Sequence, residues 1–326
     1  MRTSRAVYRL YGVLLQSSLK LPCQSAPPNS RPDVWLKLGD PTRFALARRE
    51  IGPSSRTWFS CKRLKDGCTY LRWTGLFEFL VSPDGRHIHY HRLEHATRES
   101  LAVYLLGQVL SFALLAFGRD PLHGTVVATK GKAVAIVGNC GDGKSTLAAA
   151  MLARGCRVVT DDVIALDGET GGWCVQPGVP RLKLFPSVAR KLLGYRGGAT
   201  MNKGTSKLVL PLGPDQSIGR PMPLAAIYVL SDPRAHRPSR ALEPVTLERL
   251  SGSEAFLEVI RAAFNVMVLR RERLANQFAF AARLAAEVPM RRLTYPRRLT
   301  LLPTVCDTLL ADLSTLARTQ SSVTDA

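Results

Sequence analysis

Residues 133–155 read AVAIVGNCGDGKSTLAAAMLARG, and this stretch decides the fold of the chain around it. From Gly138 to Ser145 it fits the pattern typical of phosphate-binding loops, in which two glycines bracket four residues and Lys and Ser follow. The apolar run 133–137 before the loop predicts a β-strand. The Ala- and Leu-rich run after the loop, ended by Gly155, predicts a helix. The alternative is a glycine-rich turn followed by Lys and Ser by chance. Such a turn would need neither the strand before it nor the helix after it, so the presence of both favours a phosphate-binding loop.

In a strand–loop–helix of this kind, the backbone N–H groups of the loop meet phosphate at the positive end of the helix dipole. Lys144 then reaches the outer phosphates as a point charge, and the Ser145 hydroxyl can ligate Mg²⁺. The predicted nucleotide-binding residues are Gly138, Asn139, Cys140, Gly141, Asp142, Gly143, Lys144, Ser145 and Thr146.

The composition is that of an ordinary soluble protein, with 46% hydrophobic and 21% charged residues among 326. This length allows two domains, or one large domain with an elaboration. The formal net charge of +20 is unusual and predicts an acidic partner, such as a nucleotide, a phosphorylated product, an acidic peptide or a nucleic acid. A basic face that is merely solvated is the alternative. The late arginines that contribute to this charge are Arg261, Arg270, Arg271, Arg273, Arg283, Arg291, Arg292, Arg297 and Arg298.

The seven cysteines are scattered and form no CxxC pair, which favours reduced thiols and a cytoplasmic location. The first residues lack the apolar core and cleavage site of a secretion signal, and 7–15 reads as an opening strand. The apolar stretch 101–117 is near the lower limit for a membrane span and contains Gln108 and Ser111, so we predict a buried helix.

Up to about residue 95 the sequence alternates short β-like runs with turns, as at 34–38, 70–73 and 77–81. Three histidines at alternate positions, in the run 87–91, would share one face of a strand. That face could hold Zn²⁺, but no Cys or carboxylate completes a site at a characteristic spacing, so we favour a solvated strand face.

Asp161 and Asp162 follow the predicted loop helix, within an apolar run that begins at Arg157. Magnesium bound to a nucleotide needs a hard oxygen ligand opposite Ser145, and an Asp at a strand end can supply it. A second carboxylate can accept the proton of an attacking hydroxyl, as in a kinase. Adjacent strand residues point in opposite directions, so both acids can serve only if the strand ends or bends there. A pair of turn or cap acids is the alternative.

The combination of His123-Gly124-Thr125, the glycine-rich loop and the acidic pair, in this order and spacing, resembles the catalytic domain of HPr kinase/phosphorylase and its relatives. The resemblance implies that His123, Lys144, Asp161 and Asp162 are catalytic, and that Ser145, Asp161 and Asp162 bind the metal. It leaves open which Asp is the base. The implied fold class is α/β (α+β overall), with a P-loop core like that of HPr kinase and PEP carboxykinase. The resemblance covers the predicted catalytic domain (96–318). From the sequence pattern we predict a β-rich N-terminal domain (1–95), which does not look like the usual HPr kinase N-terminal domain, and a disordered tail (319–326).

The sequence departs from HPr kinases at Thr146, where those enzymes have Glu, and in the region around PRLKLFP (180–186). The whole pattern is more similar to HPr-kinase-related serine kinases of peptide pathways, including lasso-peptide kinases. Arg181, Lys183 and Lys207 are additional candidates for phosphate or substrate contacts.

We therefore expect an ATP- and Mg²⁺-dependent serine kinase whose partner is a peptide or small protein with an acceptor Ser. We expect no membrane or nucleic-acid partner, and a homo-oligomer stays open. The alternatives are a P-loop ATPase and a nucleotide-binding regulatory module without phosphotransfer. A transporter-type ATPase is disfavoured because its second acidic motif should follow LSGSE (250–254), where the chain has VLRRER (268–273) instead.

Overall fold

The computed structural model describes residues 6–51, 57–94, 96–169, 172–202, 204–232 and 245–324. It is a mixed α/β structure with two large sheets, and its contacts divide the chain into two compact units. The first unit comprises Met1–Arg119 and Ala199–Ser206, and the second comprises Asp120–Gly198 and Lys207–Ala326.

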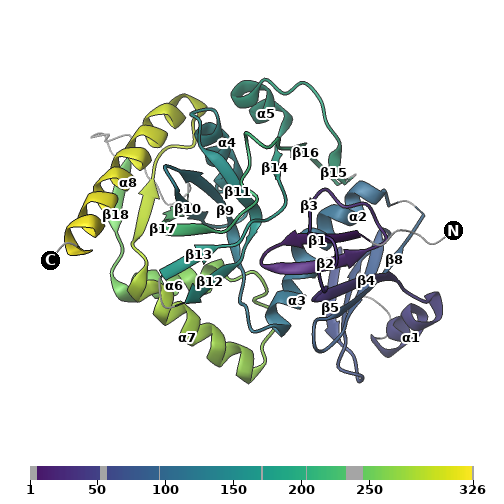
Figure 1. Cartoon of the computed structure of the whole chain (residues 1–326). Coiled ribbons are helices and arrows are strands. Elements are labelled where there is room, and N and C mark those ends of the chain that lie inside the picture. Colours follow the sequence, from purple (N-terminus) through teal and green to yellow (C-terminus); the bar gives the residue numbers. More distant parts are fainter. Residues whose placement is uncertain are drawn as a thin grey trace. The chain divides into compact units, whose positions relative to one another are not determined.

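The described part of the first unit is built on an eight-stranded sheet with the order β3-β1-β2-β4-β8-β7-β6-β5. Helix α1 (Pro41–Ile51) follows β4 (Figure 1). The strands are β1 (Ala6–Leu10), β2 (Val13–Ser17), β3 (Gln24–Ser25), β4 (Val34–Leu38), β5 (Phe59–Arg63), β6 (Thr69–Trp73), β7 (Phe77–Val81) and β8 (His87–Arg92).

The first strand expected from the sequence, 7–15, is a hairpin of β1 and β2. Tyr11 and Gly12 between them both have positive φ, at 53° and 75°, which is the backbone of a tight two-residue hairpin turn. The expectation of a single strand was wrong because Tyr11, an aromatic strand former, hides this turn.

The apolar stretch 101–117 is helical and buried, as expected, but it belongs to the first unit. It comprises α2 (Arg98–Tyr104), a π-helical turn (Leu105–Val109) and α3 (Leu110–Ala116). The Tyr104 ring packs on Trp73 and Phe77 of the sheet, at centroid distances of 5.0 Å. Residues 96–119 therefore pack with the unit that precedes them, whereas the sequence places a domain boundary before residue 96.

Two described helical stretches, Arg98–Ala116 and Leu299–Leu316, are long and apolar enough to cross a membrane by length and composition. Of the first, 72% is buried inside the structure, as in the core helix of a soluble protein, and of the second 22%. Leu302, Val305, Cys306 and Leu309 from the second stretch contribute to the core of the second unit.

The histidines of β8 share one face, as predicted, but this face is half-buried and not solvated. His87 stacks on Trp35, and His91 stacks on Phe44 and contacts Glu78 at 3.2 Å. Among the described residues, no group of three or more His, Cys, Asp or Glu side chains could hold a metal ion.

The second unit contains a sheet with the strand order β11-β9-β10-β17-β13-β12, to which β19 and β18 are joined beyond β17. Its strands are β9 (Leu122–Thr129), β10 (Lys132–Val137), β11 (Arg157–Ile164), β12 (Leu166–Glu169), β13 (Gly172–Val175), β17 (Met222–Leu230), β18 (Thr246–Arg249) and β19 (Met290–Thr294). A separate antiparallel ladder joins β14 (Arg181–Leu184) to β16 (Thr205–Pro211). Strand β15 (Thr200–Asn202) belongs to the first unit.

Helices cover both faces of this sheet (Figure 1). On one face lie α4 (Lys144–Leu152) and α8 (Leu302–Thr324), with α5 (Pro186–Leu193) beside α4. On the other face lie α6 (Gly252–Ala262) and α7 (Arg271–Glu287). Strands β10, β17 and β19 run parallel to one another, so their carboxyl ends meet at one edge, where α4 begins.

Two further expectations differ from the structure. The single helical region expected from about 253 to 287 is two helices, α6 and α7, because the chain turns back between them. The stretch 319–326, expected to be disordered, is helical through Thr324 as the end of α8, and 325–326 lie outside the described residues.

Candidate nucleotide site at the start of α4

The loop between β10 and α4, which we call the glycine loop (138–143), has a backbone that only glycine adopts easily. Gly138, Gly141 and Gly143 have φ values of 147°, 94° and 96°, and Gly143 is the N-cap of α4. The backbone N–H of Asn139 donates to Asp142 Oδ2 at 2.6 Å. The strand and the helix on either side stand where the sequence predicts them. Asp142, one of the predicted nucleotide-binding residues, therefore stabilises the conformation of the loop through this hydrogen bond.

The Lys144 side chain folds back over this loop. Its Nζ donates to the carbonyl oxygens of Gly138 and Asn139, both at 2.8 Å, and the residue is only 7% exposed. Burial lowers the pKa of Lys144 below its ordinary value. Because both partners of the Lys144 ammonium are neutral carbonyls, a small rotation of the side chain can replace them with a bound anion.

The first helical turn of α4 is joined to β11 through Asp161. Asp161 Oδ1 accepts hydrogen bonds from Ser145 Oγ at 2.9 Å and from Thr125 Oγ1 at 2.6 Å. Its other oxygen accepts the Lys183 backbone N–H at 3.0 Å. The hydroxyl and the carboxylate that the sequence predicts to share a metal are thus in contact.

Asp162 breaks the regular strand geometry, as the sequence analysis requires if both acids are to serve one site. Its φ is 79°, in the left-handed region that Asp tolerates better than most side chains, and the β11–β9 ladder shifts register between Val158 and Thr160. The Asp162 carboxylate forms an ion pair with Lys183 Nζ, in which both side chains are largely buried. Burial lowers the pKa of Lys183 to about 8, against the opposing effect of the Asp161 charge.

His123 lies on β9 directly opposite Val163, so it is next to the strand pair Gly124–Asp162. Its ring packs edge-on against Phe264, with centroids 5.4 Å apart. Burial, together with the positive charges of Lys144 and Lys183, lowers the pKa of His123 to about 4, so the ring is neutral at pH 7. The strand pairing therefore places His123 next to the position of Asp162 in the ladder. The ring contact that the structure describes for His123 is with an apolar side chain, Phe264.

The two other basic candidates lie near the same strands. Arg181 begins β14, two residues before Lys183 and thus on the same face of that strand, and it is 3% exposed. Lys207 on β16 holds its Nζ over the Phe185 ring, 5.3 Å from the centroid. The positive charge of Lys207 contributes to the lowered pKa of Lys183 and of Lys144.

Sequence reasoning missed Arg297 as a site residue and counted it only toward the net charge. Its guanidinium donates through Nε to the Asp142 carbonyl of the glycine loop at 2.8 Å, and through its other nitrogens to the carbonyls of Ser231 and Tyr295 at 2.6 and 2.9 Å. It also stacks on the Tyr295 ring at 4.2 Å. Arg297 thereby ties the loop to the ends of β17 and β19. The contact spans 155 residues of sequence, so no local pattern could have revealed it.

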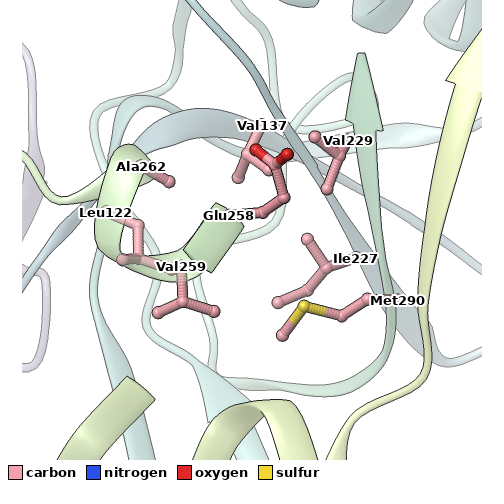
Figure 2. Close-up of a pocket in the computed structure, with 8 residues that line it drawn as sticks. All are labelled: Leu122, Val137, Ile227, Val229, Glu258, Val259, Ala262 and Met290. Atoms are coloured by element: carbon pink, nitrogen blue, oxygen red, sulfur yellow. The ribbon is translucent and has the colours of Figure 1, made fainter. Parts of the chain in front are cut away.

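A small apolar hollow lies on the opposite face of the sheet, under α6 (Figure 2). Its walls come from α6 and from four strands, and Glu258 is the one charged residue among them. The walls leave no water-sized space, so this hollow is a packing defect of the core and not a ligand site.

No protein-family model matches the chain, and no curated protein matches it. The chain is distantly similar to a solved structure of the Hpr(Ser) kinase/phosphatase from Coxiella burnetii, with a TM-score of 0.36 and 15% sequence identity, over 62% of this chain and 96% of that chain. This likeness is weak, and the function proposed below depends on the geometry of the site itself.

Proposed function

We propose that the second unit is an ATP- and Mg²⁺-dependent kinase that phosphorylates a Ser hydroxyl on a peptide or small protein in the cytoplasm. The observation that carries this proposal is the 2.9 Å contact between Ser145 Oγ and Asp161 Oδ1. It joins two segments that the sequence separates, and it does so at the N-terminus of α4. A helix N-terminus with a hydroxyl and a carboxylate beside it combines an anion site with hard oxygen ligands.

The donor set fits Mg²⁺ bound to a nucleotide. Mg²⁺ in such enzymes takes one or two carboxylates together with phosphate oxygens and waters, and does not need a cage of protein ligands. Ser145 and Asp161 would hold the ion, which when bound neutralises charge on the phosphates. The N–H groups of the glycine loop and the Lys144 ammonium would hold the phosphates in place of the loop's own carbonyls.

Asp162 then has the role of base. Its neighbour Asp161 accepts hydrogen bonds from Ser145, Thr125 and a backbone N–H, so we assign the acceptance of the hydroxyl proton to Asp162, whose side chain is bound by the flexible Lys183 ammonium. His123, neutral at pH 7, would pack beside this pair without adding charge. The net charge of +20 favours an acidic acceptor segment.

The test is to incubate the protein with Mg²⁺, γ-labelled ATP and Ser-containing peptides, including acidic ones, and to identify phosphoserine by mass spectrometry. Lys144→Met should weaken ATP binding by roughly 10- to 100-fold, since it removes charge-assisted hydrogen bonds. Lys191→Met, on the exposed surface of α5, is the matched control and should bind ATP like the unmodified protein.

Phosphate release to water with no labelled peptide would favour a P-loop ATPase. Tight binding without turnover would favour a regulatory module. Equal ATP binding by the Lys144 and Lys191 variants would remove the glycine loop from the mechanism.

A further inference from the structure

Lys183 contacts both members of the acidic pair at once. Its backbone N–H donates to Asp161 Oδ2 at 3.0 Å, and its ammonium pairs with Asp162 Oδ2. The two side chains of the ion pair are 11% and 18% exposed, for Lys183 and Asp162 respectively. The backbone of Lys183 is thus bound to Asp161, the proposed metal ligand, and its side chain is bound to Asp162, the proposed base.

These two contacts differ in mobility. The backbone contact is fixed, because β14 is paired with β16 through Lys183 and Val209. The ammonium is carried on a flexible four-carbon chain and can turn while the backbone stays in place. As long as it pairs with Asp162, that carboxylate is a poor proton acceptor, since a bound cation favours its ionised form.

The charges around Lys183 supply a reason for it to move. The Lys144 and Lys207 charges both oppose the Lys183 charge, so the Lys183 ammonium lies close to two other cations. A bound triphosphate brings negative charge to these cations, and its terminal phosphate carries the largest share of that charge.

We propose that the Lys183 ammonium transfers from Asp162 to the terminal phosphate of a bound triphosphate, and so frees Asp162 to act as base only when the phosphate donor is in place. This inference rests on the proposed function. In the transfer step, the acceptor oxygen forms a bond to the terminal phosphorus and gives its proton to Asp162. The bond from that phosphorus to the bridging oxygen breaks, and the nucleoside diphosphate leaves with the electron pair. Lys183 is a positioning residue for the base and a ligand of the phosphate.

The decisive experiment is a double-mutant cycle on nucleotide binding. A non-hydrolysable ATP analogue and ADP, each with Mg²⁺, are titrated calorimetrically into the unmodified protein, Asp162→Asn, Lys183→Met and the double variant. Asn is chosen because it tolerates the left-handed backbone at position 162 better than other side chains. Lys183→Arg keeps the charge, and Lys191→Met serves as the exposed control.

We expect Asp162→Asn to bind the analogue roughly fivefold more tightly, because Lys183 no longer has to leave an ion pair, and to bind ADP unchanged. Lys183→Met should lose roughly tenfold of the preference for the analogue over ADP, whereas Lys183→Arg should retain most of it. In the Lys183→Met background, Asp162→Asn should bring no further gain.

A second readout needs no nucleotide. Thermal unfolding of the same four proteins should show that the effects of the two single substitutions are not additive, as expected for a direct ion pair. A gain from Asp162→Asn that persists without Lys183 would mean simple repulsion between Asp162 and phosphate, and would overturn the inference. Weaker analogue binding by Asp162→Asn would also overturn it, while leaving the nucleotide site intact. If the unmodified protein binds neither nucleotide, the proposed function fails as well.

Discussion

Arg297 shows how a single side chain can set the shape of a binding loop from a distant part of the chain. All three of its guanidinium nitrogens donate to backbone carbonyls, and one of these carbonyls belongs to Asp142 of the glycine loop. Arg297 makes no described contact with the acidic pair. It therefore acts on the loop rather than on the chemistry at the terminal phosphate.

We predict that Arg297→Gln weakens nucleotide binding by roughly tenfold, because the loop loses a charge-assisted hydrogen bond that holds it in place. The rate at saturating nucleotide should change far less. Titration calorimetry and steady-state kinetics separate the two effects, and Arg298→Gln at the exposed neighbouring position is the control. A loss confined to the maximal rate would contradict a positioning role.

Glu78 in the first unit forms a buried network with Tyr70, Arg48 and His91. Burial raises its pKa, but the hydrogen bonds from these partners outweigh burial and hold the pKa below the ordinary 4.5. A carboxylate with a depressed pKa stabilises the fold at pH values above 4.5, and this contribution disappears as the pH falls through the folded-state pKa.

Glu78→Gln should therefore lower the free energy of unfolding by about 2 kcal/mol at pH 7, and the difference from the unmodified protein should shrink as the pH falls below 4.5. Urea denaturation at several pH values measures this, with the exposed Glu94→Gln as control. A difference that stays constant down to pH 3 would show that the charge of Glu78 is not what stabilises the network.

Some of these residues could be recognised from sequence and others could not. The glycine loop is local, so its spacing and the character of its flanks were enough to predict a strand, a loop and a helix. The left-handed backbone of Asp162, the ion pair to Lys183 and the clamp by Arg297 depend on contacts between distant segments. Lys183 could be proposed as a phosphate contact, but its pairing with Asp162 could not.

At the scale of elements, strand β9 is packed so closely beside β10 and β11 that only glycine fits at position 124, which pairs with Asp162. A Cβ on Gly124 would lie 2.6 Å from the Ile136 carbonyl oxygen and 2.6 Å from Ile164 Cδ1. The carbonyl belongs to the ladder between β9 and β10 and cannot move aside without loss of pairing. Gly124 also pairs with Asp162, so any shift of β9 reaches the acidic pair.

We predict that Gly124→Ala lowers the free energy of unfolding by about 1–3 kcal/mol, as overpacking of a core does. It should also reduce nucleotide-dependent activity more than its effect on stability explains. Gly197→Ala is the matched control, because a Cβ there meets open space and its φ is not positive. Equal stability of the two variants would show that β9 can relax away from β10.

The boundaries of elements were the least predictable feature at this scale. The buried helix at 101–117 was recognisable from its apolar length. Its packing against the first unit was not, because the aromatic partners of Tyr104, Trp73 in β6 and Phe77 in β7, lie 31 and 27 residues earlier in the sequence. The hairpin turn at Tyr11 was hidden for a similar reason, since an aromatic residue with positive φ has no turn signature in the sequence.

At the scale of the whole molecule, the two units have separate cores, and the proposed nucleotide site belongs to the second. A ligand that binds one unit stabilises that unit by mass action, by about 2.7 kcal/mol when its concentration is a hundred times the dissociation constant. The other unit gains nothing directly from this binding.

We predict two transitions in differential scanning calorimetry, of which the Mg²⁺-bound ATP analogue, at a hundred times its dissociation constant, raises only one, by about 5–11 °C. Limited proteolysis during the scan should assign the raised transition to fragments that contain α4 and β11. Lys144→Met should reduce the shift by at least half and leave both transitions in place. A shift of the transition assigned to β1–β8 would contradict the proposed location of the site.

The central claim is that a triphosphate sits at the N-terminus of α4 with Mg²⁺ between Ser145 and Asp161. The crystal structure of the protein with Mg²⁺ and a non-hydrolysable ATP analogue tests this most directly. We predict phosphates against the N–H groups of the glycine loop, the ion bound by Ser145 Oγ and Asp161, and the Lys144 ammonium turned from the loop carbonyls to phosphate. Nucleotide bound elsewhere, or an Asp161 that keeps its hydrogen bond from Ser145 with no ion nearby, would contradict the account.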